Sequence, residues 1–228
     1  MAEAGYAHTG WSRQQSADSA TLAVKLAAMA ALEALPPFAP VPSVSYQSQG
    51  RLLIIADSAP RVQQALEALS EDLTAAVLWT APEPVPALGA FEIVPGQLQQ
   101  LSGYLGAFEL VFVPAAGGAQ VAPFDLVLDL QARPALAMHQ PPQGYFHASN
   151  SEAFARAVAE LPQMVGEFEK PKFFAYKESI CAHSRSKKTG CNQCIDVCST
   201  SAITSAGDKV EIDPHLCMGC GACTTVCP

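Results

Sequence analysis

The placement of the cysteines restricts the fold of this 228-residue chain more than any other feature. All eight cysteines lie between residues 181 and 227, and the first 180 residues contain none. The last four follow the pattern Cys-x2-Cys-x2-Cys-x3-Cys-Pro, at Cys217, Cys220, Cys223 and Cys227. With two-residue gaps, three thiolates of one tight loop can reach the same inorganic centre, whereas the fourth thiolate points the other way. We therefore expect a cofactor-binding module at this end of the chain.

A second group of four cysteines repeats this pattern with an expanded first gap. Its spacing is Cys-x9-Cys-x2-Cys-x3-Cys, at Cys181, Cys191, Cys194 and Cys198. Ser199 stands where proline follows the last cysteine of the other group. The two groups form a pair, and the nine-residue gap sets Cys181 apart from the other seven candidate ligands.

The segment between the two groups predicts a short hairpin, with strands at Ala202–Ile203 and Val210–Ile212 and a turn at residues 206–208. Together with both cysteine groups, residues 173–228 resemble the two-[4Fe-4S] bacterial-type ferredoxin domain, a small α+β fold. The resemblance implies two [4Fe-4S] clusters with crossed ligands, and electron transfer between redox protein partners. The first cluster would take Cys181, Cys191, Cys194 and Cys227, and the second cluster would take Cys198, Cys217, Cys220 and Cys223.

Three further segments are similar to longer proteobacterial multi-cluster ferredoxin-like proteins, which continue into additional iron–sulfur motifs. These segments are SGYLGAF at 102–108, PPQGYF at 141–146 and GEFEKPKFFAYKESICAHSR at 166–185. This second resemblance implies a dehydrogenase partner, such as a formate-type enzyme. A complete ferredoxin repeat continues past its Cys-Pro pair into a short strand, so we expect the ferredoxin-like domain to be truncated at Pro228.

The cysteine pattern leaves three alternatives open. Two four-cysteine zinc sites would use the same thiolates. A [3Fe-4S] cluster at the first site would not need Cys181 as a ligand. Disulfides are disfavoured because the chain is predicted to be cytoplasmic, where thiols stay reduced. That location follows from the N-terminus, which has no basic start followed by an apolar core.

Charge and hydropathy restrict the partners. The formal net charge of −8 argues against a nucleic-acid partner. The most apolar stretch, Thr21–Leu35, is interrupted by Lys25 and Glu33 and predicts no membrane span, which takes roughly 20 apolar residues. The sequence contains no recognisable catalytic constellation. It therefore predicts an electron carrier or oxidoreductase subunit rather than an enzyme with its own substrate site.

The cysteine-free part of the chain predicts an α/β fold. Arg51–Ala56 is a buried-strand pattern, followed by a helix at Arg61–Leu69 and a strand at Ala75–Thr80. This βαβ order implies a partly parallel sheet with a right-handed crossover. Further strands are expected at Phe91–Val94, Phe108–Val113 and Phe124–Leu130, and further helices at Thr21–Leu35 and Ser151–Leu161. The predicted organisation is an N-terminal arm, helix and proline-rich linker over 1–45, an α/β domain over 46–166 and a small α+β ferredoxin-like domain over 167–228.

The turn after the first predicted strand bears on the role of the α/β domain. It reads DSAP at residues 57–60 and lacks the glycine-rich loop of a dinucleotide site, so we interpret the domain as structural or docking. Two other functions stand as hypotheses. One is a redox or oxygen sensor whose clusters report through this domain, and the other is a flavin- or nucleotide-dependent oxidoreductase fed by the ferredoxin-like module.

The nine-residue gap of the first group carries three basic residues, Arg185, Lys187 and Lys188. A positive field at this point would favour the reduced, more negative cluster and would steer an acidic redox partner. The hypothesis is therefore that this loop is the docking face for a redox partner. The alternative is a solvated loop that covers the first cluster.

Overall fold

The computed structural model describes residues 19–35, 41–86, 91–183 and 190–228. The chain divides into two units, Met1–Pro40 and Val41–Pro228, and each is described by itself.

The first unit contains helix α1 at Ser19–Glu33, where the sequence predicts a helix over Thr21–Leu35. The apolar side chains of Val24, Leu26 and Leu32 are exposed on this helix. In the part of the chain that the structure describes, no helix combines the length and the apolar character needed to cross a bilayer.

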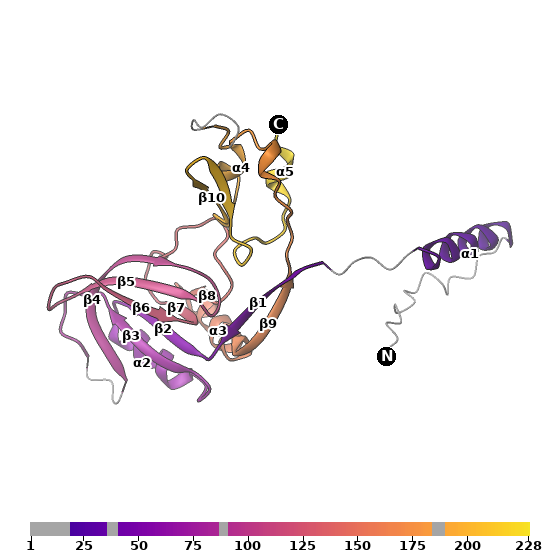
Figure 1. Cartoon of the computed structure of the whole chain (residues 1–228). Helices are drawn as coiled ribbons and strands as arrows, with labels where there is room; N and C mark the ends of the chain where they lie inside the picture. The colour runs from indigo at the N-terminus through magenta and orange to yellow at the C-terminus, as the bar shows by residue number, and fades with distance from the viewer. Residues whose placement is uncertain (1–18, 36–40, 87–90, 184–189) are drawn as a thin grey trace. The chain divides into compact units, whose positions relative to one another are not determined.

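The second unit is built on a seven-stranded sheet with the strand order β6-β5-β4-β3-β2-β7-β8 (Figure 1). The strands are β2 (Arg51–Ala56), β3 (Thr74–Trp79), β4 (Glu92–Ser102), β5 (Phe108–Pro114), β6 (Gln120–Phe124), β7 (Leu126–Asp129) and β8 (Tyr145–His147). Strand β2 pairs in parallel with both β3 and β7, and helix α2 (Ala59–Ala68) connects β2 to β3. The predicted βαβ unit and partly parallel sheet are confirmed.

Strand β2 shows why the sheet forms around this segment. Its residues Leu52 to Ala56 are at most 1% exposed, because both faces of the strand are covered. Leu52 and Ile54 belong to one hydrophobic core, and Leu53 and Ile55 belong to the other. A run of β-branched and aliphatic residues is typical of such a doubly covered parallel strand.

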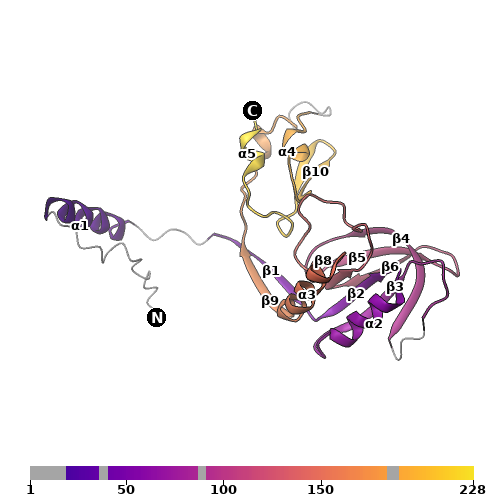
Figure 2. The same ribbon diagram turned by 180° about the vertical axis from the view of Figure 1, so that it is seen from behind.

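Two cores lie on opposite faces of the sheet. The first is covered by α2 and by α3 (Ser151–Glu160), which contributes Phe154 and Ala157 (Figure 2). The second is closed by residues of β4 and β5, including Leu101 and Phe108, because this antiparallel end of the sheet folds over the parallel strands. Helix α3 begins where Asn150 caps it, with its side-chain oxygen accepting from the Ala153 N–H at 2.8 Å.

A separate two-stranded antiparallel ribbon joins segments from the two ends of this unit. It consists of β1 (Ser43–Ser48) and β9 (Gly166–Pro171), and neither strand is predicted from the sequence. Strand β1 has alternating buried and exposed residues, but its sequence SVSYQS is mostly polar and follows a proline-rich segment. The predicted domain limits at 45/46 and 166/167 fall within β1 and β9, and that division stays a prediction.

The sheet differs from the sequence prediction in three further places. The single strand expected over Phe124–Leu130 is interrupted. Strand β6 ends at Phe124 and pairs with β5, whereas β7 begins at Leu126 and pairs with β2. Strand β8 has only three residues and carries no recognisable pattern. Strand β4 continues to Ser102, well past the predicted Val94, and contains a register shift between Leu98 and Gln100.

The cysteine-rich part contains the predicted hairpin and several short helices. The hairpin pairs β10 (Ile203–Ala206) with β11 (Lys209–Ile212) around Gly207. The predicted hairpin is confirmed, but its first strand extends to Ala206 instead of ending at Ile203. The helical turns are η3 (Glu178–Ile180), α4 (Gln193–Asp196) and α5 (Ala222–Thr225), and they follow the 3-10 segment η2 (Leu161–Met164) in the chain.

Candidate iron–sulfur site

All eight cysteines lie in described residues, and none of them forms a disulfide. Cys194 is carried by α4 and Cys223 by α5, whereas the others lie in the loops around these helices. The two thiols Cys220 and Cys227 are exposed and the other six are half-buried. Thiols held together without disulfides are the donor set that iron–sulfur clusters use.

The thiols of the second motif lie beside Cys198 of the first motif. The pKa of Cys223 is raised by burial and by the negative charges of Cys217, Cys220 and Cys198. Such charge effects act over short distances, so these four sulfurs share one region of the structure. This is the set that the ferredoxin resemblance implies for the second cluster.

The remaining thiols gather around α4. Burial raises the pKa of Cys194, and the charges of Cys181 and Cys191 raise it further. Cys227 lines an open surface depression together with Gln193 and Val197, which flank Cys194 on and just after α4. The structure thus brings Cys181 close to Cys194 in spite of the nine-residue gap. The assignment of ligands to two clusters stays a proposal.

Hydrogen-bond donors surround the sulfur of Cys198. Burial raises its pKa, but donors lower it below the ordinary thiol value: the Thr200 hydroxyl, 3.6 Å from the sulfur, and the backbone N–H groups of Thr200, Ala202 and Ile203. A lowered pKa favours the thiolate, which is the form that ligates iron. Donors to sulfur also tune the potential of a bound cluster, so this environment fits the implied cofactor.

No group of three or more His, Cys, Asp and Glu side chains within the described ranges has the arrangement needed to hold a single metal ion. The interpretation as cluster ligands therefore rests on the cysteine spacing, on the grouping of the thiols and on the family match given below.

An aromatic ring that the sequence analysis missed packs on the second ligand loop. Gly219, between two expected ligands, has a φ of +71°, and a Cβ added there would lie 2.6 Å from Cγ of Phe173. The ring therefore occupies the space in which any side chain at position 219 would lie. Only glycine satisfies both the left-handed backbone and this close approach.

The substitution Gly219→Ala is expected to weaken retention of the second cluster by about tenfold or more, because it forces Phe173 or the ligand loop to move. The measurement is the rate of iron release to a chelator under anaerobic conditions. Gly221→Ala is the matched control, since Gly221 has a similar φ of +75° but its added Cβ would meet only Thr224 Oγ1 at 4.0 Å. Equal iron loss in the two variants would contradict the role of Phe173.

His183 joins the two ends of the nine-residue segment between Cys181 and Cys191. Its side chain is 1% exposed. Its Nδ1–H donates to the carbonyl oxygen of Cys191 at 3.0 Å, and its Nε2 accepts from the Ser205 hydroxyl at 3.1 Å. A Cβ on Gly190 would lie 2.7 Å from Cα of His183, so the two ends of the gap are pressed together. The predicted docking residues Arg185, Lys187 and Lys188 lie outside the described residues.

Replacing His183 with alanine is expected to lower iron affinity at the first site by about 10- to 100-fold, as loss of an outer-shell partner does at other metal sites. The measurement is EPR of the oxidised protein, in which partial loss of iron from a cubane gives a three-iron signal. Ser205→Ala removes one of the two hydrogen bonds and should have a smaller effect. Equal damage to both clusters would mean that His183 acts only on overall stability.

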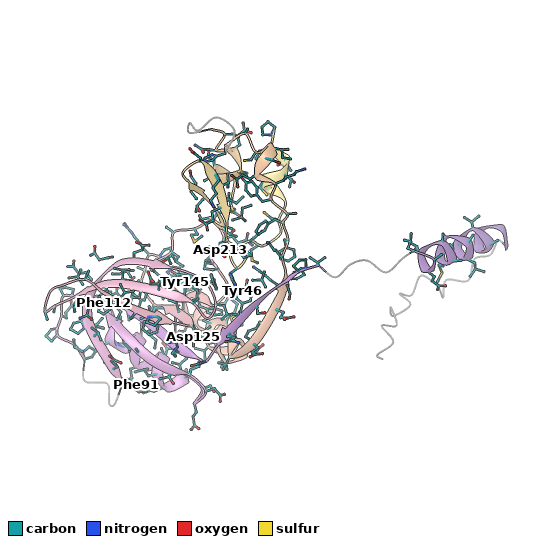
Figure 3. The ribbon with its side chains drawn as sticks, viewed as in Figure 1. Tyr46, Phe91, Phe112, Asp125, Tyr145 and Asp213 are labelled. Carbon is teal, nitrogen blue, oxygen red and sulfur yellow. The ribbon has the colours of Figure 1, made fainter. Side chains whose placement is uncertain are left out.

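A second set of residues contacts the loop that leads into Cys217. The Tyr46 hydroxyl donates to the carbonyl oxygen of His215 at 2.6 Å, and Tyr104 stacks on the His215 ring at a centroid distance of 4.2 Å. Lys170 Nζ donates to the carbonyl oxygens of His215 at 2.5 Å and Cys217 at 2.9 Å. We call Tyr46, Tyr104 and Lys170 the loop clamp (Tyr46 is labelled in Figure 3).

The electrostatics of the loop clamp follow from its partial burial. Burial raises the pKa of Tyr46 to about 12, with further contributions from Asp213, Tyr104 and Cys217, so its hydroxyl remains a donor. Burial lowers the pKa of Lys170, while the negative charges of Cys217 and Asp213 act in the opposite direction. The sequence analysis did not identify these residues, because they lie far from the cysteines in the chain.

Residues 189–228 match the protein family described as 4Fe-4S dicluster domain. This segment is therefore similar to ferredoxin-type iron–sulfur domains. Two curated relatives are each 46% identical over 35 residues: "Ferredoxin 7Fe" of Hydrogenibacillus schlegelii and "Ferredoxin" of Alicyclobacillus acidocaldarius subsp. acidocaldarius. Each match covers 15% of this chain and 45% of the relative, so the chain spans less than half the length of these relatives.

Proposed function

We propose that this protein relays electrons through two [4Fe-4S] clusters between a redox donor and an acceptor, as a module of an oxidoreductase system. The grouping of the thiols carries the proposal: Cys198 lies with the second motif, and Cys181 and Cys191 lie with Cys194. This grouping supports a crossed arrangement of ligands, as in two-cluster ferredoxins. The family match to a dicluster domain supports the same interpretation.

The chain's own residues have defined roles in this proposal. The first site is formed by Cys181, Cys191, Cys194 and Cys227, and the second by Cys198, Cys217, Cys220 and Cys223. Each bound cluster supplies one-electron chemistry, and the protein supplies position and electrostatic surroundings. Thr200 and the backbone after Cys198 stabilise one ligand as a thiolate. His183 and Phe173 hold the two ligand loops in place. The dehydrogenase partner implied by the resemblance to longer ferredoxin-like proteins is part of the proposal.

A nucleotide-binding function receives no support from the carboxyl edge of the sheet, where open α/β sheets bind ligands. Beyond β2 and β7, the Arg61 guanidinium donates to the carbonyl oxygens of Leu130 and Ala148. The Gln131 side-chain amide donates to the Thr80 hydroxyl at 3.0 Å. These side chains occupy the edge with internal hydrogen bonds, which favours a structural role for it.

Anaerobic iron and sulfide quantification, combined with EPR before and after reduction, tests the proposal. Two cubanes require about eight irons and eight sulfides per chain. About seven irons, the number in the name of the relative "Ferredoxin 7Fe", would together with a three-iron signal in the oxidised state instead assign a [3Fe-4S] cluster to the first site. Anaerobically prepared protein that contains no iron, or contains zinc, would overturn the electron-transfer proposal. Flavin absorbance in the same sample would favour an oxidoreductase with its own cofactor.

A further inference from the structure

The second ligand loop is held by segments that precede the cysteine-rich part in the chain. Strand β9 supplies Lys170, and its continuation supplies Phe173, which packs on Gly219. Tyr46 comes from β1, and Tyr104 comes from the turn after β4. Contacts from three separate elements thus converge on residues 215–219, which begin the loop with three of the four second-site ligands.

The loop that carries the remaining second-site ligand, Cys198, is also bonded to a residue that precedes the cysteine-rich part in the chain. The Gln140 N–H donates to the carbonyl oxygen of Ser199 at 3.2 Å, and the Ser199 hydroxyl donates to the Gln140 side-chain oxygen at 3.2 Å. Ser199 follows Cys198 directly. Residues next to Cys198 and Cys217 are therefore both bonded to the α/β part of the chain.

Lys170 is the charged member of this arrangement. Its ammonium group lies 2.9 Å from the carbonyl oxygen of Cys217 and 5.2 Å from the centre of the Tyr46 ring. The side chain is half-buried, so its charge is less screened by water than that of an exposed lysine. A fixed positive charge beside a ligand loop stabilises the extra negative charge that one-electron reduction adds.

We propose that the α/β part of the chain tunes the second cluster through the loop clamp, with Lys170 as the residue that raises the reduction potential of this cluster. The inference rests on the proposed two-cluster function and gives the α/β part a role in it. Tyr104 and Tyr46 are positioning residues, because they fix the His215 segment that Lys170 contacts. The first cluster, whose proposed ligands lie around α4, should not be affected by the loop clamp.

Lys170→Met tests this inference, because methionine keeps most of the side-chain length and removes the charge and both hydrogen bonds. EPR-monitored redox titration of the full chain reads the potential of each cluster. Lys170→Met should make reduction of the second cluster roughly tenfold less favourable. That change corresponds to 59 mV for a one-electron couple. The affected signal should be the one that is absent from a Cys198→Ser variant.

Two variants distinguish tuning by charge from a general structural effect. Lys172→Met removes a charge two residues away, where the ammonium lies 5.0 Å from the Phe174 ring, and should leave both potentials unchanged. Lys170→Arg retains the charge and should keep the reduction potential of the second cluster close to that of the wild type. Unchanged potentials in Lys170→Met, or equal shifts in the two methionine variants, would overturn the inference while leaving the two-cluster proposal intact. Protein without clusters would overturn the two-cluster proposal itself.

Discussion

Serine in place of Cys198 is expected to remove the second cluster and to leave the first in place, although Cys198 belongs to the first cysteine motif. The sulfur of Cys198 lies with those of Cys217, Cys220 and Cys223, and a serine hydroxyl is a poor substitute for a soft thiolate ligand of iron. The iron content should fall from about eight to about four per chain. EPR of the reduced protein should then contain the signal of one cluster.

Cys194→Ser provides the matched control for this prediction. Cys194 lies four residues before Cys198, in the same motif, but its sulfur lies with Cys181 and Cys191. Its loss should remove the first cluster and retain the second. If the two variants lose the same cluster, each motif binds its own cluster and the crossed assignment is wrong.

Asp125→Ala is expected to destabilise the sheet by about 3 kcal/mol, because buried donors lose their acceptor. Asp125 connects β6 to β7 in the chain, and its side chain is 2% exposed (Figure 3). It accepts from the backbone N–H groups of Gln49 at 2.9 Å and Arg51 at 3.1 Å. It also forms a 2.6 Å ion pair with the half-exposed Arg51 guanidinium. Denaturant unfolding followed by tryptophan fluorescence checks the value, since Trp79 is buried in β3.

The same carboxylate gives the stability a defined pH dependence. Burial acts to raise the pKa of Asp125, but the hydrogen bonds from Arg51 and Gln49 lower it below the ordinary value of 3.8. Its contribution is therefore fully present above the unfolded-state pKa and is lost as the pH falls through the lower folded-state pKa. The difference in unfolding free energy between wild type and Asp125→Ala should shrink in that acidic range. A difference that does not change with pH would contradict the assignment.

The sequence predicts the elements in which local pattern and burial agree. Arg51–Ala56 is a continuous aliphatic run, and the structure places it as a strand buried on both faces. The cysteine spacing likewise defines the candidate ligands, because the covalent order of the loop determines which thiolates can converge. In both cases the information lies within a few neighbouring residues.

The elements that the sequence analysis missed depend on distant partners. Strands β1 and β9 are short and largely polar, and they form because they pair with each other. The loop clamp has the same character, since Tyr46 and His215 are 169 residues apart. Phe173 has no pattern that connects it with Gly219. No local property of these residues distinguishes them from ordinary surface positions.

The β1–β9 pairing also sets an order of events during biosynthesis. The ribosome makes the chain from its N-terminus, so β1 must wait for β9 until the entire sheet has been made. Every cysteine comes later still, because Cys181 follows the end of β9. The scaffold that presents Lys170 can therefore be complete before any iron ligand has left the ribosome. Cluster insertion would then take place on a chain whose supporting framework is already folded.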